Sequence, residues 1–215
     1  MKRLVLPRLY VILDRALLTV PETECALRLV DAGVRLLQYR HKAASARELL
    51  ETSRRLSTAL ISRDVTFIVN DRADVAALSG ASGVHVGQDD LRVETARSVI
   101  GAGKLVGVST HNLEQFQQAA ASSADYIAVG PVFSTATKDN PDPVVGTEFI
   151  RRVRPLTDKA IVAIGGITLD RAAEVIQAGA DSIAVISDIL RAPEPARRAR
   201  QYIDLLEAVK PAAAV

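Results

Sequence analysis

Short apolar runs rich in β-branched residues alternate with longer amphipathic segments along almost the whole chain. The runs are nearly continuous in apolar character, which is typical of parallel strands covered by helices. Eight of them are predicted as strands, over residues 9–13, 35–40, 65–70, 83–87, 104–109, 125–130, 160–165 and 181–186. Eight repeated strand-then-helix units predict an α/β fold, a closed (β/α)8 TIM barrel that forms a single domain.

The segments between these runs have the Ala, Leu, Glu and Arg content of helices. Helices are expected over residues 22–32, 46–62, 93–100, 113–121, 147–153 and 169–178. Several of them end at a glycine, as at Gly33, Gly101 and Gly179, where a left-handed residue commonly ends a helix. An open doubly wound sheet is the alternative fold. The eight similar units and the lack of a G-x-G-x-x-G turn after the first strand disfavour it.

Length and composition agree with one folded domain. The 215 residues are 48% hydrophobic and 24% charged, which is the balance of globular proteins and not of disordered chains. We expect one domain over residues 1–215, in which residues 8–209 form the barrel and residues 210–215 form a frayed tail.

Charge, aromatic content and cysteine usage exclude several classes of partner. Lys and Arg number 27 against 25 Asp and Glu, and there is no Trp, so nucleic-acid binding is not expected. No run approaches the ~18 to 20 apolar residues of a membrane span. The single cysteine, Cys25, cannot form an internal disulfide, so a reducing compartment and a cytoplasmic protein are expected. The sequence leaves open whether the chain forms a homo-oligomer.

Three polar residues stand at alternate positions at the end of the second predicted strand. Gln38, Arg40 and Lys42 share one face while the chain stays extended, and this face points into the barrel mouth, where barrel enzymes hold their active sites. A guanidinium in that position needs an anion to offset its desolvation. The triplet therefore indicates either an anionic ligand or a salt bridge to a carboxylate on another strand.

Carboxylates follow the next two strands. Asn70 ends the third predicted strand and Asp71 follows it, and Asp90 ends a Gln-Asp-Asp run after the fourth. Two carboxylates on neighbouring strands beside Arg40 and Lys42 are the arrangement expected for Mg²⁺ held together with phosphate oxygens. Helix capping is the alternative, because both aspartates precede helical segments. Their joint occurrence beside the cations favours the metal site.

Ser109 ends the fifth predicted strand and is available for a ligand. It is not needed as a helix cap, because Asn112 stands three residues before a glutamine in the spacing of a capping box. The three histidines, His41, His85 and His111, stand alone, and a lone histidine is more often structural. No catalytic role is assigned to them.

Two further features fall at the same end of the predicted barrel. The stretch 131–146 is longer than a usual connection and is interpreted either as a lid over the barrel mouth or as a surface loop. Gly165-Gly166 follows the seventh strand and Ile186-Ser187 ends the eighth, where barrels often bind phosphate through backbone N–H groups. The residues thus predict an enzyme with two phosphate-type sites, one metal-assisted and one lined by glycine.

Seven motifs arrive in order between the second and the eighth predicted strands. They are QYRHK (38–42), IVNDR (68–72), GVHVGQDDL (83–91), GVSTH (107–111), AVGPVFSTATK (128–138), AIGGI (163–167) and AGADSIAVIS (178–187). Together they resemble the thiamine phosphate synthase (thiamine-phosphate pyrophosphorylase) family. The resemblance implies a transferase that condenses 4-amino-5-hydroxymethyl-2-methylpyrimidine diphosphate with 4-methyl-5-(2-phosphoethyl)thiazole, releasing diphosphate. It also implies Mg²⁺ as the cofactor and small phosphorylated molecules as the partners.

Carried over position by position, the resemblance implies a role for individual residues. The pyrimidine diphosphate would be held by Gln38, Arg40, Lys42, Asn70, Ser109 and Lys138, of which Arg40, Ser109 and Lys138 would also act in catalysis. Asp71 and Asp90 would hold Mg²⁺. The thiazole phosphate would be bound by Thr135, Thr137, Gly166, Ile186 and Ser187.

Two positions depart from the family pattern. Ser134 stands where a proline is expected in the loop motif, and Asp188 follows Ser187 where a small residue is commoner. A carboxylate at position 188 would repel phosphate unless it points away. A thiazole tautomerase-like protein and a non-catalytic, phosphate-sensing barrel are the alternative functions. The complete diphosphate set, from Gln38 to Asp90, favours the synthase over the tautomerase.

Overall fold

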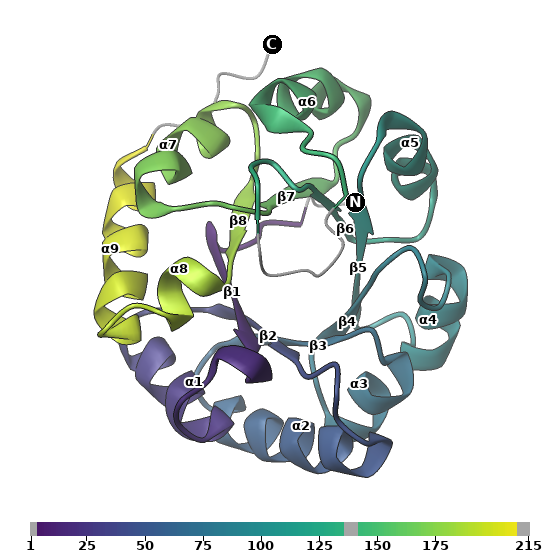
Figure 1. Cartoon of the computed structure of the whole chain (residues 1–215). Helices are drawn as coiled ribbons and strands as arrows, with labels where there is room; N and C mark the ends of the chain where they lie inside the picture. Colours follow the sequence, from purple (N-terminus) through teal and green to yellow (C-terminus); the bar gives the residue numbers. More distant parts are fainter. Residues whose placement is uncertain (1–3, 136–141, 210–215) are drawn as a thin grey trace.

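The computed structural model describes residues 4–135 and 142–209. Eight parallel strands close into a barrel in chain order, and the last strand pairs with the first. Figure 1 looks along this barrel, with the strands around the centre and the helices outside. The strands are β1 (Leu9–Asp14), β2 (Leu36–Arg40), β3 (Thr66–Asn70), β4 (Gly83–Val86), β5 (Leu105–Thr110), β6 (Tyr126–Val129), β7 (Ala160–Ile164) and β8 (Ser182–Val185). The predicted (β/α)8 TIM barrel is confirmed, and the predicted tail, residues 210–215, lies outside the described residues.

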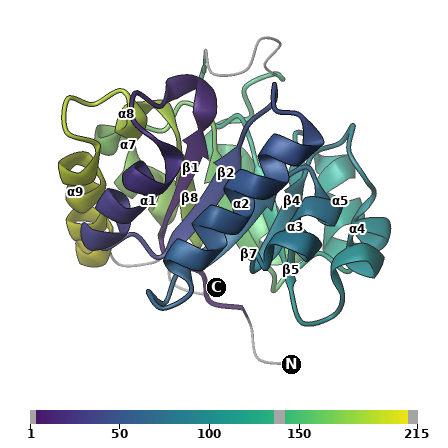
Figure 2. The ribbon, with the colours of Figure 1, turned by 90° about the horizontal axis from the view of Figure 1, so that it is seen from below.

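The helices form an outer ring that covers the strands, as Figures 1 and 2 show from two directions. They are α1 (Glu22–Asp31), α2 (Ala46–Leu60), α3 (Ala73–Ser79), α4 (Val93–Ile100), α5 (Leu113–Ala121), α6 (Gly146–Val153), α7 (Leu169–Gln177), α8 (Ser187–Leu190) and α9 (Pro195–Ala208), with single 3-10 turns over Arg15–Leu17 and Arg154–Leu156. Within residues 4–135 and 142–209, none of these helices combines the length and the apolar character needed to cross a bilayer.

Two apolar layers hold the barrel together. The larger layer lies between strands and helices and buries side chains such as Leu29, Phe116 and Val175 completely. The smaller layer fills the barrel interior and includes the buried rings of Tyr10 and Tyr126. Because successive side chains of a strand point to opposite faces, each strand can contribute to both layers. The inner layer forms a floor, and the polar residues at the strand ends stand above it.

The bounds of the strands and of α1, α2, α4, α5, α6 and α7 agree with the predicted ones to within two residues, whereas no bounds were predicted for α3, α8 and α9. Strand β5 runs one residue further than predicted, because Thr110 pairs with Val129 of β6. Gly33 and Gly179 lie two residues after the ends of α1 and α7, and Gly101 directly follows α4. Their φ angles of +103°, +110° and +84° are positive, as expected for glycines that end helices. Gly101 has a ψ of 169°, so it differs from the predicted left-handed helical conformation. The strand ends therefore lie where the predicted site residues can surround one barrel mouth.

Candidate active site

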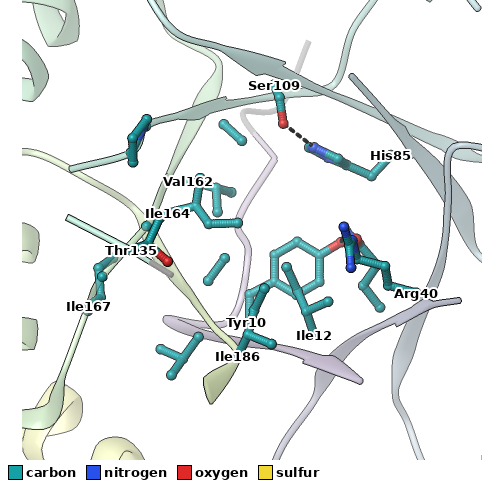
Figure 3. A pocket seen from close by; sticks show the side chains of 18 of the residues that line it. Tyr10, Ile12, Arg40, His85, Ser109, Thr135, Val162, Ile164, Ile167 and Ile186 are labelled. Carbon is teal, nitrogen blue, oxygen red and sulfur yellow. Dashed lines mark hydrogen bonds between the residues drawn. The ribbon is translucent and has the colours of Figure 1, made fainter. Parts of the chain in front are cut away.

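A cavity of about 570 Å³ opens at the carboxyl ends of the strands, and every strand or the loop after it contributes to its wall. Figure 3 shows Tyr10 near the centre of this cavity, His85 and Ser109 on one side, and Ile164 and Ile186 on the other. The position agrees with the rule that barrel enzymes carry their active sites at this end. We therefore take this cavity as the candidate active site.

Most residues singled out from the sequence lie around this one cavity. It is lined by Gln38, Arg40, Lys42, Asn70, Asp71, Asp90, Ser109, Thr135, Gly166, Ile186 and Ser187. The remaining two predicted site residues, Thr137 and Lys138, lie outside the described residues. Closing the barrel thus gathers polar side chains that are far apart in the sequence.

Gln38 and Arg40 of β2 point into the barrel, and both are held by the neighbouring strand β1. Gln38 Nε2 donates a hydrogen bond of 2.8 Å to Tyr10 Oη. Arg40 donates to the carboxylate of Asp14, which is only 3% exposed, so the salt bridge considered in the sequence analysis is present. A guanidinium has five N–H donors, and one carboxylate cannot occupy all of them. Arg40 also lines the cavity, so its remaining N–H groups can bind an anion there.

Asp71 and Asp90 lie next to one another at the cavity mouth, beside Lys42. Asp71 follows β3 with a φ of +62°, an uncommon backbone conformation outside glycine that is often found at functional sites. The ammonium of Lys42 bonds to its carboxylate, and Asp90 Oδ2 accepts the N–H of Gly87 at 2.7 Å. Burial raises the pKa of Asp71, Lys42 opposes this increase, and the adjoining Asp90 carboxylate adds to it. Two neighbouring carboxylates of this kind favour a shared cation.

Neither aspartate caps a helix. The cap positions of α3 and α4 are Arg72 and Arg92, and neither helix has a side-chain cap. The helix-capping alternative for Asp71 and Asp90 is therefore wrong, and both carboxylates line the cavity instead.

The aspartate pair fits Mg²⁺. Within the described part of the chain, no group of three or more His, Cys, Asp or Glu residues gathers as a metal site. The protein would therefore supply two carboxylates and leave the other positions to water and phosphate oxygens, as is usual for Mg²⁺ in sites that bind phosphorylated substrates. Asp71 and Asp90 are the residues that would hold it.

Five polar side chains form a hydrogen-bonded chain across the barrel interior. Beyond the bond from Gln38 to Tyr10, Tyr10 Oη lies 3.0 Å from Tyr126 Oη, which lies 3.1 Å from His85 Nδ1. His85 Nε2 then lies 2.8 Å from Ser109 Oγ (Figure 3). The His85 ring also stacks on Tyr126 with centroids 5.6 Å apart. This chain connects Gln38 and Ser109, two residues predicted to bind the same substrate.

His85 was treated as structural in the sequence analysis, yet it lines the cavity. Burial lowers its pKa to about 4, so the ring is neutral near pH 7 and offers one donor and one acceptor. The ring therefore donates to one of its two neighbours and accepts from the other. Side chains along a strand point alternately into and out of the barrel, and His85 stands at an inward position of β4, as Gln38 and Arg40 do in β2. Applying that alternation to every strand would have found both His85 and Tyr10.

The opposite side of the cavity, which we call the glycine-lined end, is formed by Gly165, Gly166, Ile186 and Ser187. The two glycines have φ angles of +100° and +62°. Phe133 N donates to Gly165 O at 3.0 Å, and a Cβ on Gly166 would lie 2.9 Å from Phe133 Cβ. Only glycine allows the loops after β6 and β7 to approach so closely. Ser187 begins α8 at the same place, so backbone and a hydroxyl converge there.

Two arginines add positive charge to the cavity wall, and the sequence analysis did not single them out. Arg171 and Arg191 both line the cavity, and the Arg171 guanidinium lies 4.8 Å from the centroid of the Phe133 ring. Positive charge in a cavity wall attracts anionic ligands. The cavity therefore has one end with cations and carboxylates and a second, glycine-lined end with arginines nearby.

Comparison with known proteins agrees with this geometry. A family model described as "Thiamine monophosphate synthase" matches residues 9–189. The thiamine-phosphate synthase of Koribacter versatilis (strain Ellin345) is 51% identical over 208 residues, which cover 94% of this chain and 96% of that protein. The thiamine-phosphate synthase of Chloroflexus aurantiacus is 43% identical and covers 90% of each chain. The solved structure of thiamine phosphate pyrophosphorylase from Pyrococcus furiosus superposes with a TM-score of 0.86 at 35% identity, over 94% of this chain and 96% of that one.

Fold and site together define a (β/α)8-barrel enzyme that works at the carboxyl ends of its strands. The chain belongs to the thiamine monophosphate synthase family. The resemblance drawn from the seven motifs is thereby confirmed, and with it the expectation of a transferase of thiamine biosynthesis.

Proposed function

We propose that this chain condenses 4-amino-5-hydroxymethyl-2-methylpyrimidine diphosphate with 4-methyl-5-(2-phosphoethyl)thiazole to give thiamine phosphate and diphosphate. The proposal rests mainly on one observation: a single cavity has two chemically different ends, and each end suits an anionic group. One end offers cations and a carboxylate pair, which suit a diphosphate with Mg²⁺. The other end offers glycine backbone and the start of α8, which suit a phosphate monoester. The two reacting groups would meet above the cavity floor.

The pyrimidine diphosphate would be bound beside β2, β3 and β5. In this proposal Arg40 and Lys42 neutralise the diphosphate, while Gln38 and Asn70 orient it through their amides. The Ser109 hydroxyl would donate to an oxygen of the diphosphate, since its neighbour His85 fixes its position.

Departure of diphosphate is the demanding step of this reaction. The leaving group departs from a CH₂ attached to an electron-rich aminopyrimidine ring, which stabilises the positive charge left on carbon. The protein must then chiefly stabilise the negative charge on the leaving group. Mg²⁺ bound by Asp71 and Asp90 would supply part of that stabilisation, and Arg40, Lys42 and Lys138 would supply the rest. The thiazole nitrogen is already nucleophilic, so no general base is needed.

The thiazole phosphate would be bound at the glycine-lined end. The backbone of Gly166 and Ile186 and the hydroxyl of Ser187 would contact the phosphate, and Thr135 and Thr137 of the loop after β6 would complete the pocket. Arg171 and Arg191 would add positive charge around it. In this proposal the ring of the thiazole would face the pyrimidine, and its phosphate would lie away from the diphosphate.

The alternatives differ from this proposal in what the cavity would have to hold. A tautomerase-like protein would need the glycine-lined end but no carboxylate pair for a metal diphosphate. A non-catalytic sensing barrel would bind phosphorylated molecules without turnover. The combination of Asp71, Asp90 and the β2 cations supports the synthase over the tautomerase, and a test for turnover distinguishes the synthase from the sensing barrel. The single buried thiol and the small phosphorylated substrates are compatible with the cytoplasmic location that we propose.

The proposal is tested by incubating the purified protein with both substrates, with and without Mg²⁺, and measuring thiamine phosphate by chromatography. We expect product only when both substrates and Mg²⁺ are present. Absence of product at saturating substrate concentrations would contradict the synthase function. Conversion of the thiazole substrate into an isomer instead would support the tautomerase alternative.

A further inference from the structure

Asp188 departs from the family pattern, and it lies at the glycine-lined end of the cavity. It stands in the first turn of α8, directly after Ser187, and lines the cavity. Its side chain is 16% exposed. An uncompensated carboxylate beside a bound phosphate would repel it, most strongly where little water screens the two charges. Binding of a phosphate here therefore requires that the Asp188 carboxylate is neutralised by other groups of the protein.

Two residues of α9 bind the Asp188 carboxylate. Arg198 contacts both carboxylate oxygens, with Nε 3.0 Å from Oδ2 and Nη2 3.2 Å from Oδ1. The hydroxyl of Tyr202 donates to Oδ2 at 2.7 Å. Helix α8 packs against α9 on the outer side of the barrel, as Figure 1 shows. A bidentate guanidinium and a phenol thus offset the negative charge from the side of α9.

Tyr202 also connects the two loops that form the glycine-lined end. Its hydroxyl lies 3.3 Å from the carbonyl oxygen of Ile167, the residue after Gly166. The Tyr202 ring is fully buried, and burial raises the pKa of its phenol, so the hydroxyl remains a donor. One buried side chain therefore contacts both the loop after β7 and the start of α8.

We infer that Arg198 is a positioning residue of the phosphate subsite, because it neutralises Asp188 so that a phosphate dianion can bind beside α8. The inference rests on the proposed function and deepens it, because it explains how this chain accepts a carboxylate next to the substrate phosphate. Arg198 then acts on substrate binding through Asp188, without contacting the substrate. Loss of Arg198 would leave an unpaired negative charge at the subsite.

The test compares steady-state constants of Arg198→Gln with those of the wild type. We expect KM for the thiazole phosphate to rise about ten-fold, while kcat and KM for the pyrimidine diphosphate stay within about two-fold. Arg198→Lys keeps the positive charge and should stay within about three-fold of the wild-type KM. The double variant Asp188→Asn/Arg198→Gln removes the unpaired charge and should restore the wild-type KM to within about three-fold.

Arg197→Gln is the matched control, because Arg197 is the preceding residue, is 76% exposed and pairs with Glu194. It should leave all constants unchanged. Melting temperatures of all variants report whether each one folds. An unchanged KM in Arg198→Gln, or a double variant as impaired as the single one, would overturn the inference.

A separate binding measurement keeps this inference distinct from the proposed reaction. Titration calorimetry with the thiazole phosphate alone, and with the same thiazole alcohol lacking phosphate, requires no turnover. The inference predicts that Arg198→Gln weakens binding of the phosphate and leaves binding of the alcohol unchanged. Equal weakening of both ligands would indicate a purely structural defect and would overturn it. A wild type that binds the phosphate but forms no product would contradict only the proposed function.

Discussion

His85 Nε2 lies 2.8 Å from Ser109 Oγ, which joins the end of β4 to the end of β5 at the cavity wall. His85 is itself held by Tyr126, whose hydroxyl lies 3.1 Å from Nδ1 and whose ring stacks on the imidazole. The Ser109 hydroxyl is therefore fixed before any substrate binds. Preorganised donors of this kind stabilise developing charge at no cost in reorganisation during the reaction.

Ser109→Ala should lower kcat by about 10² with a much smaller change in either KM, since one preorganised donor is lost. Steady-state kinetics with both substrates measures the effect. Ser98→Ala is the matched control, because the Ser98 hydroxyl donates to Glu94 O on the exposed side of α4. A kcat for Ser109→Ala equal to that of the control would show that the hydroxyl has no part in the chemistry.

Gly107→Ala should destabilise the barrel and disturb the polar chain at the same time. A Cβ at this position of β5 would overlap the ring of Tyr126, which has no room to move in the filled interior. We expect a loss of about 2 kcal/mol or more in the free energy of unfolding, measured by urea denaturation. Gly103→Ala is the control, because among the described residues no atom beyond the two chain neighbours of Gly103 lies within 4 Å of a Cβ there. Equal stability of the two variants would rule out the predicted overlap.

Lys138→Ala should lower kcat more than it raises KM for the thiazole phosphate. The proposal places the Lys138 ammonium at the departing diphosphate, where charge develops only as the bond breaks, and a group that acts there affects kcat first. Steady-state kinetics with the thiazole phosphate varied separates the two constants. The opposite pattern, a raised KM with kcat preserved, would assign Lys138 to the thiazole phosphate instead.

Cys25 should be unreactive in the folded protein. Burial in α1 raises the pKa of its thiol to about 11, with a smaller opposing effect of Arg28. The thiol is then almost fully protonated at pH 8, and its thiolate fraction should increase about ten-fold per pH unit up to its pKa. We expect iodoacetamide at pH 8 to leave Cys25 of the native protein unlabelled and the activity intact. In denaturant the same reagent should label the thiol rapidly. Mass spectrometry measures the labelling in both cases. Rapid labelling of the native protein at pH 8 would contradict the predicted burial.

Strand ends were predictable from the sequence because buried parallel strands leave a strong apolar signal. That signal placed Asp71 and Asp90 directly after β3 and β4, and strand order alone was enough to bring them together. The glycine-lined end followed for the same reason, since Gly166 and Ser187 come directly after β7 and β8. Because the barrel closes, residues that directly follow different strands all lie around the same cavity.

Other features could not be predicted because they depend on which side chains meet across the barrel. The sequence gives no partner for Arg40, and only the register of β1 against β2 pairs it with Asp14. Helix capping by the two aspartates was equally compatible with the sequence, and it is decided by where α3 and α4 begin. The neutralisation of Asp188 was also hidden, since Arg198 comes from a helix that follows the last recognised motif.

The Mg²⁺ dependence of the initial rate of thiamine phosphate formation tests the central claim most directly. The wild type should require Mg²⁺, and Asp71→Asn and Asp90→Asn should each lose activity by about 10² or more or need far more Mg²⁺. Asp74→Asn, a change at an Asp that is 53% exposed and paired with Arg72, should behave as the wild type. A rate independent of Mg²⁺, or aspartate variants with the wild-type Mg²⁺ response, would contradict a metal-assisted condensation at this barrel mouth.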